Sequence, residues 1–262
     1  MNALLISVND LSWSILLPAF CAGVLVIATH VPLGMQVLQR GIIFIDLAIA
    51  QVAGLGAYFV TMVWGSEAPV LWVQLGAMGM ALVAAWLLVA TERVTTRYQE
   101  PVIGIVFVLA ATAVVLLLAN DPHGGQHLSE LLAGQILWIG WAQIFYSALV
   151  TLALLGAIVL FQGKRFWFYS LFAVAITVSV QLVGVYLVFA TLIIPALATI
   201  KLEGKRRRRL WATYLVALVG YVLGLLGSAL FDLPTGPLIV WTLAVVGVVA
   251  LLMLRRQRSS PF

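Results

Sequence analysis

Charged residues are scarce in this chain. Only 9% of its 262 residues carry charge and 64% are hydrophobic, whereas soluble domains are about a quarter charged and about half apolar. Apolar runs recur along the whole length, and several reach the ~20 residues that a helix needs to cross a bilayer. These runs do not show the apolar and polar alternation of barrel strands. The composition therefore predicts an all-α, polytopic transmembrane protein with a single membrane domain over residues 1–262.

Patterns for cysteine chemistry, nucleotide binding and hydrolysis are also missing. Cys21 is the only cysteine, so one chain can form neither a disulfide nor a multi-cysteine metal site. The sequence contains no Gly-x-x-x-x-Gly-Lys-Ser/Thr loop, no HExxH pair and no serine-hydrolase constellation. Residues 1–10 lack a basic region and a clear cleavage site, which predicts a retained lead-in to the first span. We therefore expect neither an enzyme nor a nucleotide-binding chain.

Seven apolar runs predict membrane spans, and an eighth run is ambiguous. Residues 166–200 form one apolar block of 35 residues, too long for one ordinary span and slightly short for two. It predicts either two short spans that meet near residues 181–184 or a re-entrant hairpin buried in protein. The chain therefore has about eight or nine predicted membrane segments. The seven clearer spans are 12–31, 42–64, 70–90, 102–119, 144–161, 210–231 and 238–254.

The basic residues predict the orientation of the chain. Cytoplasmic joints collect Lys and Arg, and the joints 65–69, 120–130 and 232–236 contain none. An external N-terminus and a cytoplasmic C-terminus place every basic residue on one side, provided that the 166–200 block leaves and returns. The opposite face then carries carboxylates and histidines, which attract cations, although the positive-inside rule alone also explains this asymmetry. The fourteen basic residues are Arg40, Arg93, Arg97, Lys164, Arg165, Lys201, Lys205, Arg206, Arg207, Arg208, Arg209, Arg255, Arg256 and Arg258.

Asp46 is the only acidic residue well inside a predicted span. An ionised side chain there costs about 2.5 to 3.5 kcal/mol on the mildest scale, so it needs compensation. It could line a polar pathway or bind an ion. It could instead pair with Arg40, or simply lie in the interfacial part of this helix. Gln51 lies five positions on, about 140° around the helix, so this helix alone is not expected to supply a paired ligand site. Asp46 and Gln51 are both candidates for the transport pathway.

Two further groups are candidates for function. The external joint presents His123 and His127 beside Asp121, an arrangement that could hold or pass a metal ion, or be an ordinary solvated loop. The joint with Lys201, Lys205 and Arg206 is most simply an orientation anchor that touches anionic lipid. Docking of a cytoplasmic partner is the alternative reading of these cations.

Four segments resemble the permeases of zinc and manganese ABC importers. They are Leu-Gln-Arg-Gly-Ile-Ile-Phe-Ile-Asp-Leu-Ala-Ile-Ala-Gln-Val-Ala-Gly-Leu-Gly at 38–56, His-Leu-Ser-Glu-Leu-Leu-Ala-Gly-Gln-Ile-Leu-Trp at 127–138, Val-Gly-Val-Tyr-Leu-Val-Phe-Ala-Thr-Leu-Ile-Ile-Pro-Ala at 183–196 and Asp-Leu-Pro-Thr-Gly-Pro at 232–237. The resemblance implies a bacterial inner-membrane permease with a second permease copy, an ATPase on the cytoplasmic face and an extracytoplasmic metal-binding protein. It implies no permanently bound cofactor and no nucleic acid, only a transported zinc or manganese ion.

The chain departs from the family pattern at two places. The family usually carries Asp and His four apart in the second helix, and here Ala50 occupies the position four after Asp46. The family also usually has a longer acidic stretch after the span that ends at Phe161, and this chain has only residues 162–165 before the next apolar run. The coupling contact with the ATPase is therefore expected either to move to the joint that contains Lys201, Lys205 and Arg206, or to be altered in a divergent branch of the family. A secondary metal/proton transporter and a non-transporting scaffold are the alternatives.

Overall fold

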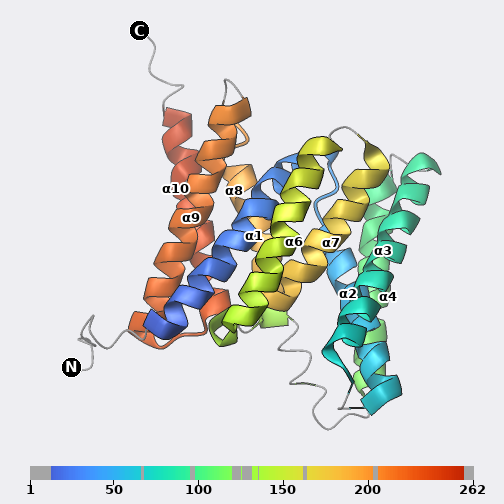
Figure 1. The fold of residues 1–262 in the computed structure, drawn as a ribbon. Coiled ribbons are helices and arrows are strands. Elements are labelled where there is room, and N and C mark those ends of the chain that lie inside the picture. The colour runs from blue at the N-terminus through green and yellow to red at the C-terminus, as the bar shows by residue number, and fades with distance from the viewer. Residues whose placement is uncertain are drawn as a thin grey trace. The chain divides into compact units, whose positions relative to one another are not determined.

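The computed structural model describes residues 13–65, 68–94, 98–119, 125, 132–134, 136–161, 164–202 and 206–256. Within these ranges every regular element is helical (Figure 1). The elements are α1 (Trp13–Arg40), α2 (Ile45–Trp64), α3 (Val70–Val94), α4 (Gln99–Leu118), the short 3-10 helix η4 (Ile136–Trp138), α6 (Trp141–Leu160), α7 (Arg165–Val183), α8 (Val185–Ala198), α9 (Arg206–Phe231) and α10 (Thr235–Arg256).

The helix lengths confirm the predicted membrane fold. Eight of the described helices are long and apolar enough to cross a bilayer, and α8 is a shorter apolar helix. The helix bounds differ most from the predicted spans at α1, which continues through Pro32 to Arg40 instead of ending at Val31. The stretch after Pro32 is itself apolar, and α1 buries Leu33, Met35 and Val37, so packing maintains the helix past the proline.

The 166–200 block consists of two helices that are separated at Gly184. This arrangement fits both the two-span and the re-entrant form of the prediction, because α8 has only 14 residues. Gly184 has φ of +81°, a conformation that glycine adopts without the steric cost other residues meet. A Cβ there would also lie 2.7 Å from the carbonyl carbon of Ala133 and from the Cα of Gly134. Chain direction and close backbone contact therefore both require glycine at the junction of α7 and α8.

The described residues gather in two compact units, each assembled from separate stretches of the chain. The first unit draws on residues 1–39, 133–151 and 182–262, and the second on residues 40–132 and 152–181. Each unit thus takes helices from both halves of the sequence. That residues 1–262 act as a single permease domain stays a prediction.

In the first unit, glycines allow the helices to approach closely. α9 and α10 lie side by side (Figure 1), and a Cβ at Gly224 would lie 2.6 Å from the Cα of Ile239. Gly247 of α10 faces Ile194 of α8 at a similar separation. Small residues at such crossings are typical of helix packing in membranes, where dispersion contacts replace the hydrophobic effect.

The Asp-Leu-Pro-Thr-Gly-Pro segment forms the turn between α9 and α10. Asp232 has φ of +51°, which aspartate tolerates better than most residues. Ser228 near the end of α9 donates to the carbonyl of Leu233 at 2.7 Å and pairs with the Thr235 hydroxyl at 2.5 Å. These bonds satisfy polar groups at the helix ends, so the motif is a closed turn.

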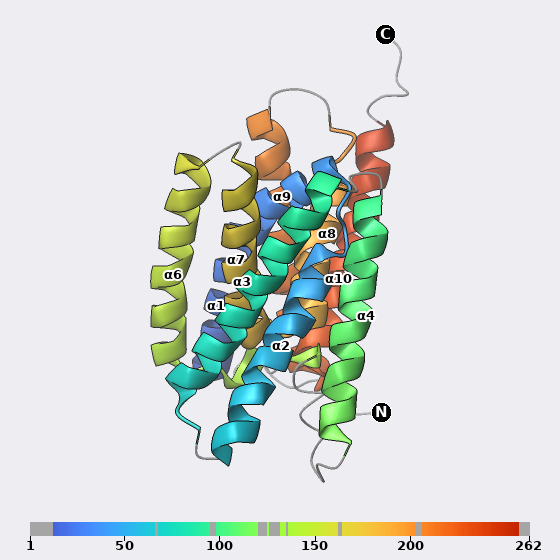
Figure 2. The same cartoon turned by 90° about the vertical axis from the view of Figure 1, so that its right-hand side faces the viewer.

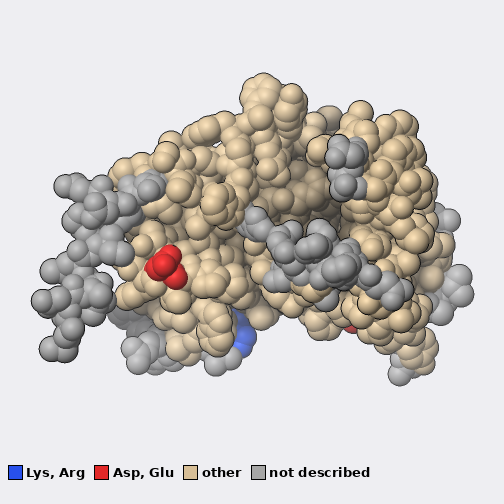
Figure 3. All heavy atoms as spheres, turned by 90° about the horizontal axis from the view of Figure 1, so that it is seen from below, with Lys and Arg blue, Asp and Glu red and all other residues tan. Residues whose placement is uncertain are grey.

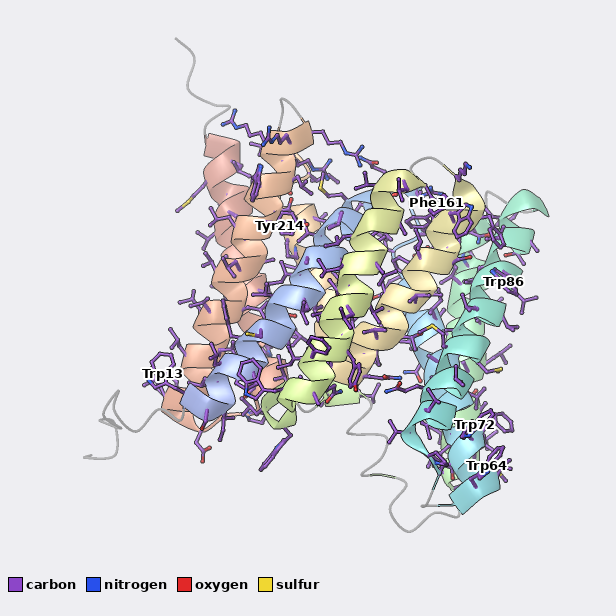
Figure 4. The ribbon with its side chains drawn as sticks, in the orientation of Figure 1. Trp13, Trp64, Trp72, Trp86, Phe161 and Tyr214 are labelled. Atoms are coloured by element: carbon purple, nitrogen blue, oxygen red, sulfur yellow. The ribbon has the colours of Figure 1, made fainter. Side chains whose placement is uncertain are left out.

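In the second unit, α2, α3 and α4 lie together (Figure 2). The backbones of α2 and α3 approach at Gly56 and Gly76, where a Cβ on Gly76 would lie 2.9 Å from the Gly56 carbonyl oxygen. Aromatic pairs lie toward opposite ends of this unit, Trp64 with Trp72 at one and Trp86 with Phe166 toward the other (Figure 4). Such aromatic positions match the two interfaces of a bilayer.

The described cations gather at one end of each unit. In the first unit, Lys201 and Arg206 lie between the end of α8 and the start of α9. In the second, Arg40 and Lys164 contact the aromatic rings of Phe168 and Phe161. Figure 3 looks onto the side on which α9 ends and α10 begins, and Lys and Arg contribute almost nothing to the described surface in view.

Candidate functional site

Asp46 lies in the first turn of α2, completely enclosed. Gly41, with φ of +70°, turns the chain after α1, and α2 begins at Ile45. Asp46 is 1% exposed, and neither carboxylate oxygen has a hydrogen-bond partner among the described residues. The start of a helix is a favourable place for a negative charge. A cation beside this buried carboxylate would offset the cost of its charge.

Arg40 does not neutralise Asp46. The guanidinium carbon of Arg40 lies 4.1 Å from the centroid of the Phe168 ring, a cation–π contact between the end of α1 and α7. Because the Asp46 oxygens have no partner in the described part of the chain, the structural alternative of an Asp46–Arg40 pair is wrong. The prediction of Asp46 as a pathway residue stays open.

A second carboxylate contacts the chain just before α2, and the sequence did not point to it. Glu100 of α4 accepts a hydrogen bond at Oε1 from the backbone N–H of Phe44, at 3.1 Å, two residues before Asp46. The predicted span began at residue 102, which left Glu100 in a loop. No local pattern could identify this contact, since 56 residues separate its partners.

Gln51 is also buried in α2, at 3% exposure, and its Oε1 has no partner among the described residues. Gln51 and Asp46 lie on different sides of the helix, and both are buried. Protein therefore covers α2 on both of these sides. Ala50, four positions after Asp46, is 1% exposed. No group of three or more His, Cys, Asp and Glu that could hold a metal occurs within the described ranges. That α2 alone supplies no paired ligand site stays a prediction.

Several predicted residues lie outside the described part of the chain. They are His123, His127 and Lys205. Their roles as pathway and coupling residues stay predictions.

Hydrogen bonds join the end of α8 to the first turns of α9, next to the exposed cations Lys201 and Arg206. Thr199 and Thr213 join their hydroxyls at 2.7 Å, and the Arg209 Nη2 donates to the Ala196 carbonyl at 3.5 Å. Lys201 and Arg206 are exposed. A docking partner or a lipid headgroup could therefore reach both of these side chains without displacing the helices.

His30 is the polar residue of α1 that the sequence interpretation missed. It is 0% exposed, its Nδ1 lies 2.9 Å from the Val26 carbonyl oxygen, and its Nε2 has no partner among the described residues. The signal was present, because an ionisable residue inside an apolar span marks a functional site by default. Nearby, the Tyr214 hydroxyl of α9 donates to the Ala28 carbonyl of α1 at 3.0 Å (Figure 4).

Comparisons with known proteins identify relatives over most of the chain. A family model described as "ABC 3 transport family" matches residues 12–171 and 162–254. The "Probable iron transport system membrane protein" of Haemophilus influenzae is 26% identical over 175 residues, 58% of this chain and 64% of that protein. The "Chelated iron transport system membrane protein YfeD" of Yersinia pestis is 32% identical over 176 residues, 59% of each chain. The "Probable metal transport system membrane protein" of Chlamydia trachomatis is 20% identical over 257 residues, 85% of this chain and 87% of that one.

Two solved structures share the fold. "PsaBC from Streptococcus pneumoniae in complex with Fab" superposes with a TM-score of 0.76 at 19% identity, covering 96% of this chain and 95% of that one. An inward-facing ABC transporter of metal-chelate type gives a TM-score of 0.64 at 16% identity, covering 92% of this chain and 85% of that one. At these identities the likeness is one of architecture.

Proposed function

Because the chain belongs to the ABC 3 transport family, we propose that it is the membrane-spanning permease subunit of an ABC importer for a divalent metal ion. The family membership confirms the resemblance seen in the sequence and makes the chain a transport component of a multi-pass membrane system. ATP hydrolysis belongs to a partner, in keeping with the missing phosphate-binding loop.

Zinc or manganese is the proposed cargo. The observation that carries a metal pathway is Asp46, a buried carboxylate with no partner for either oxygen among the described residues. A passing divalent cation would offset the cost of this charge inside the membrane. Carboxylate oxygens suit manganese and also bind zinc. Relatives named for iron and for metal transport fit the same chemistry.

The proposed partners meet the chain at its two membrane faces. An extracytoplasmic binding protein delivers the ion at the face that carries His123 and His127. An ATPase docks on the cytoplasmic face, where Lys201, Lys205 and Arg206 supply the contact, and anionic lipid surrounds the same cations. A second copy of the permease completes the transporter as a homodimer.

The proposed mechanism is alternating access. The ion passes the external histidines, reaches a central path that includes Asp46 and Gln51, and leaves inward when the ATPases cycle. Asp46 supplies charge and Gln51 supplies a neutral oxygen. The cytoplasmic end is the basic one, which gives an external N-terminus and a cytoplasmic C-terminus in the bacterial inner membrane.

Uptake by cells that express the chain with its partners tests the proposal. Asp46→Asn keeps the size of the side chain and removes its charge, so zinc and manganese accumulation should fall at least about tenfold. Thr177→Val is the matched control, because Thr177 is buried in α7 and bonds only to its own helix at Ala173. Full uptake by Asp46→Asn at normal abundance would remove Asp46 from the path.

A further inference from the structure

His30 lies on the face of α1 that packs against α8 and α9. Gly23 and Gly34, seven positions before and four after it, fall within about 40° of His30 on a helical projection. A Cβ on Gly23 would lie 2.6 Å from the Tyr221 ring of α9, and one on Gly34 would lie 2.9 Å from the Leu192 carbonyl carbon of α8. His30, at 0% exposure, is therefore enclosed by protein between two close helix contacts, one with an aromatic ring and one with a backbone.

One ring nitrogen of His30 is fixed. Nδ1 lies 2.9 Å from the Val26 carbonyl oxygen, which can only accept, so Nδ1 carries the hydrogen in that bond. The Thr29 hydroxyl, which donates to the same carbonyl at 3.2 Å, lies 3.0 Å from Nδ1. In the neutral imidazole this tautomer leaves the lone pair on Nε2.

The other ring nitrogen, Nε2, is buried, and no described group donates a hydrogen bond to it. Nε2 has no hydrogen-bond partner among the described residues, in a side chain that is 0% exposed. An acceptor left in this way costs about 1 to 3 kcal/mol.

We propose that His30 is a metal ligand of the transport path, offering Nε2 to the passing cation. A metal-bound histidine usually donates its other ring N–H to a backbone carbonyl or carboxylate, which fixes the tautomer and orients the ring. In His30 this N–H is on Nδ1, and the Val26 carbonyl accepts its hydrogen bond. Zinc accepts such a nitrogen readily. The inference rests on the proposed function.

A single imidazole suits a transported ion. No cluster of three or more His, Cys, Asp and Glu surrounds His30 in the described part of the chain. Water and neutral oxygens then complete the coordination shell, which keeps the binding weak enough for the ion to leave. The ordinary alternative is a core histidine whose only task is the hydrogen bond to Val26, and the two readings differ in what Nε2 does.

Nitrogen NMR on the full chain in lipid nanodiscs separates the two readings directly. The chain has three histidines, so the His123→Asn/His127→Asn variant without an affinity tag leaves His30 as its only imidazole. With ring-15N histidine, Zn²⁺ alone should shift the Nε2 resonance and leave Nδ1 protonated. An Nε2 resonance that does not move at saturating Zn²⁺ overturns the inference.

Zinc uptake by cells that express His30 variants is the second test. His30→Asn places an amide N–H where Nδ1 lies, so the bond to Val26 persists while Nε2 is lost, and His30→Gln is a second variant with an amide farther out. Both should lower zinc uptake at least about tenfold at normal abundance, and Thr177→Val should not. Normal uptake by either folded His30 variant overturns the proposed role of His30 and leaves the proposed function of the chain standing. No zinc or manganese uptake by the wild type with its partners overturns the proposed function, and the NMR result still decides on His30.

Discussion

Gly34→Ala tests the close approach of α1 and α8. A Cβ at Gly34 would overlap the Leu192 carbonyl oxygen and lie 2.9 Å from its carbon and 3.4 Å from its Cα. All three atoms belong to the backbone, so no side-chain rotation relieves the contact and the helices must separate. Overpacking of this kind costs about 1 to 3 kcal/mol, and alanine regains at most about 1 kcal/mol through helix propensity.

The overlap with a backbone oxygen places the cost at the upper end of this range, so the expected net loss is about 2 kcal/mol, a roughly 30-fold lower ratio of folded to unfolded protein. The assay is the thermal midpoint of the purified chain in detergent, followed by size-exclusion chromatography. Gly104→Ala is the matched control, since no heavy atom lies within 4 Å of a Cβ built on this glycine of α4. The control should keep or raise the midpoint. A Gly34→Ala midpoint equal to or above that of the wild type would refute the packing argument.

Three further substitutions test Glu100 and the basic joint. Glu100→Gln keeps a neutral oxygen for the Phe44 N–H and should lower the thermal midpoint less than Glu100→Ala, which removes the acceptor. The lost charge-assisted bond is worth about 1.5 to 3 kcal/mol, discounted toward 1 kcal/mol because the contact is exposed. Equal midpoints for the two variants would contradict this role. Arg206→Glu reverses an exposed charge at the start of α9 and should lower co-purification of the ATPase severalfold at normal abundance of the chain. Unchanged recovery of the ATPase would remove Arg206 from the docking surface.

Hydropathy and length were enough to predict the helices and the break in the long apolar block. A span needs a local run of apolar residues, so its signal lies in the sequence itself. The position of the break at Gly184 was expected because two helices must share 35 residues and glycine tolerates the positive φ that joins them. Helix ends were less predictable, since packing against other helices carried α1 past Pro32.

The polar contacts of the site could not be predicted from local patterns. The sequence left Arg40 as a partner for Asp46, and only tertiary packing places Arg40 over Phe168 instead. Glu100 meets the Phe44 backbone across 56 residues, a separation at which no spacing rule operates. The burial of His30 likewise depends on close contacts of α1 with α8 and α9.

The proposed function requires this chain to move a divalent metal ion inward while a partner hydrolyses ATP. Proteoliposomes that contain the chain, its ATPase and the binding protein test this when loaded binding protein is added outside. Zinc or manganese should accumulate only with ATP on the ATPase side, and this accumulation should persist without a proton gradient. Accumulation driven by a proton gradient without ATP would contradict the proposed function, and so would no accumulation under either condition.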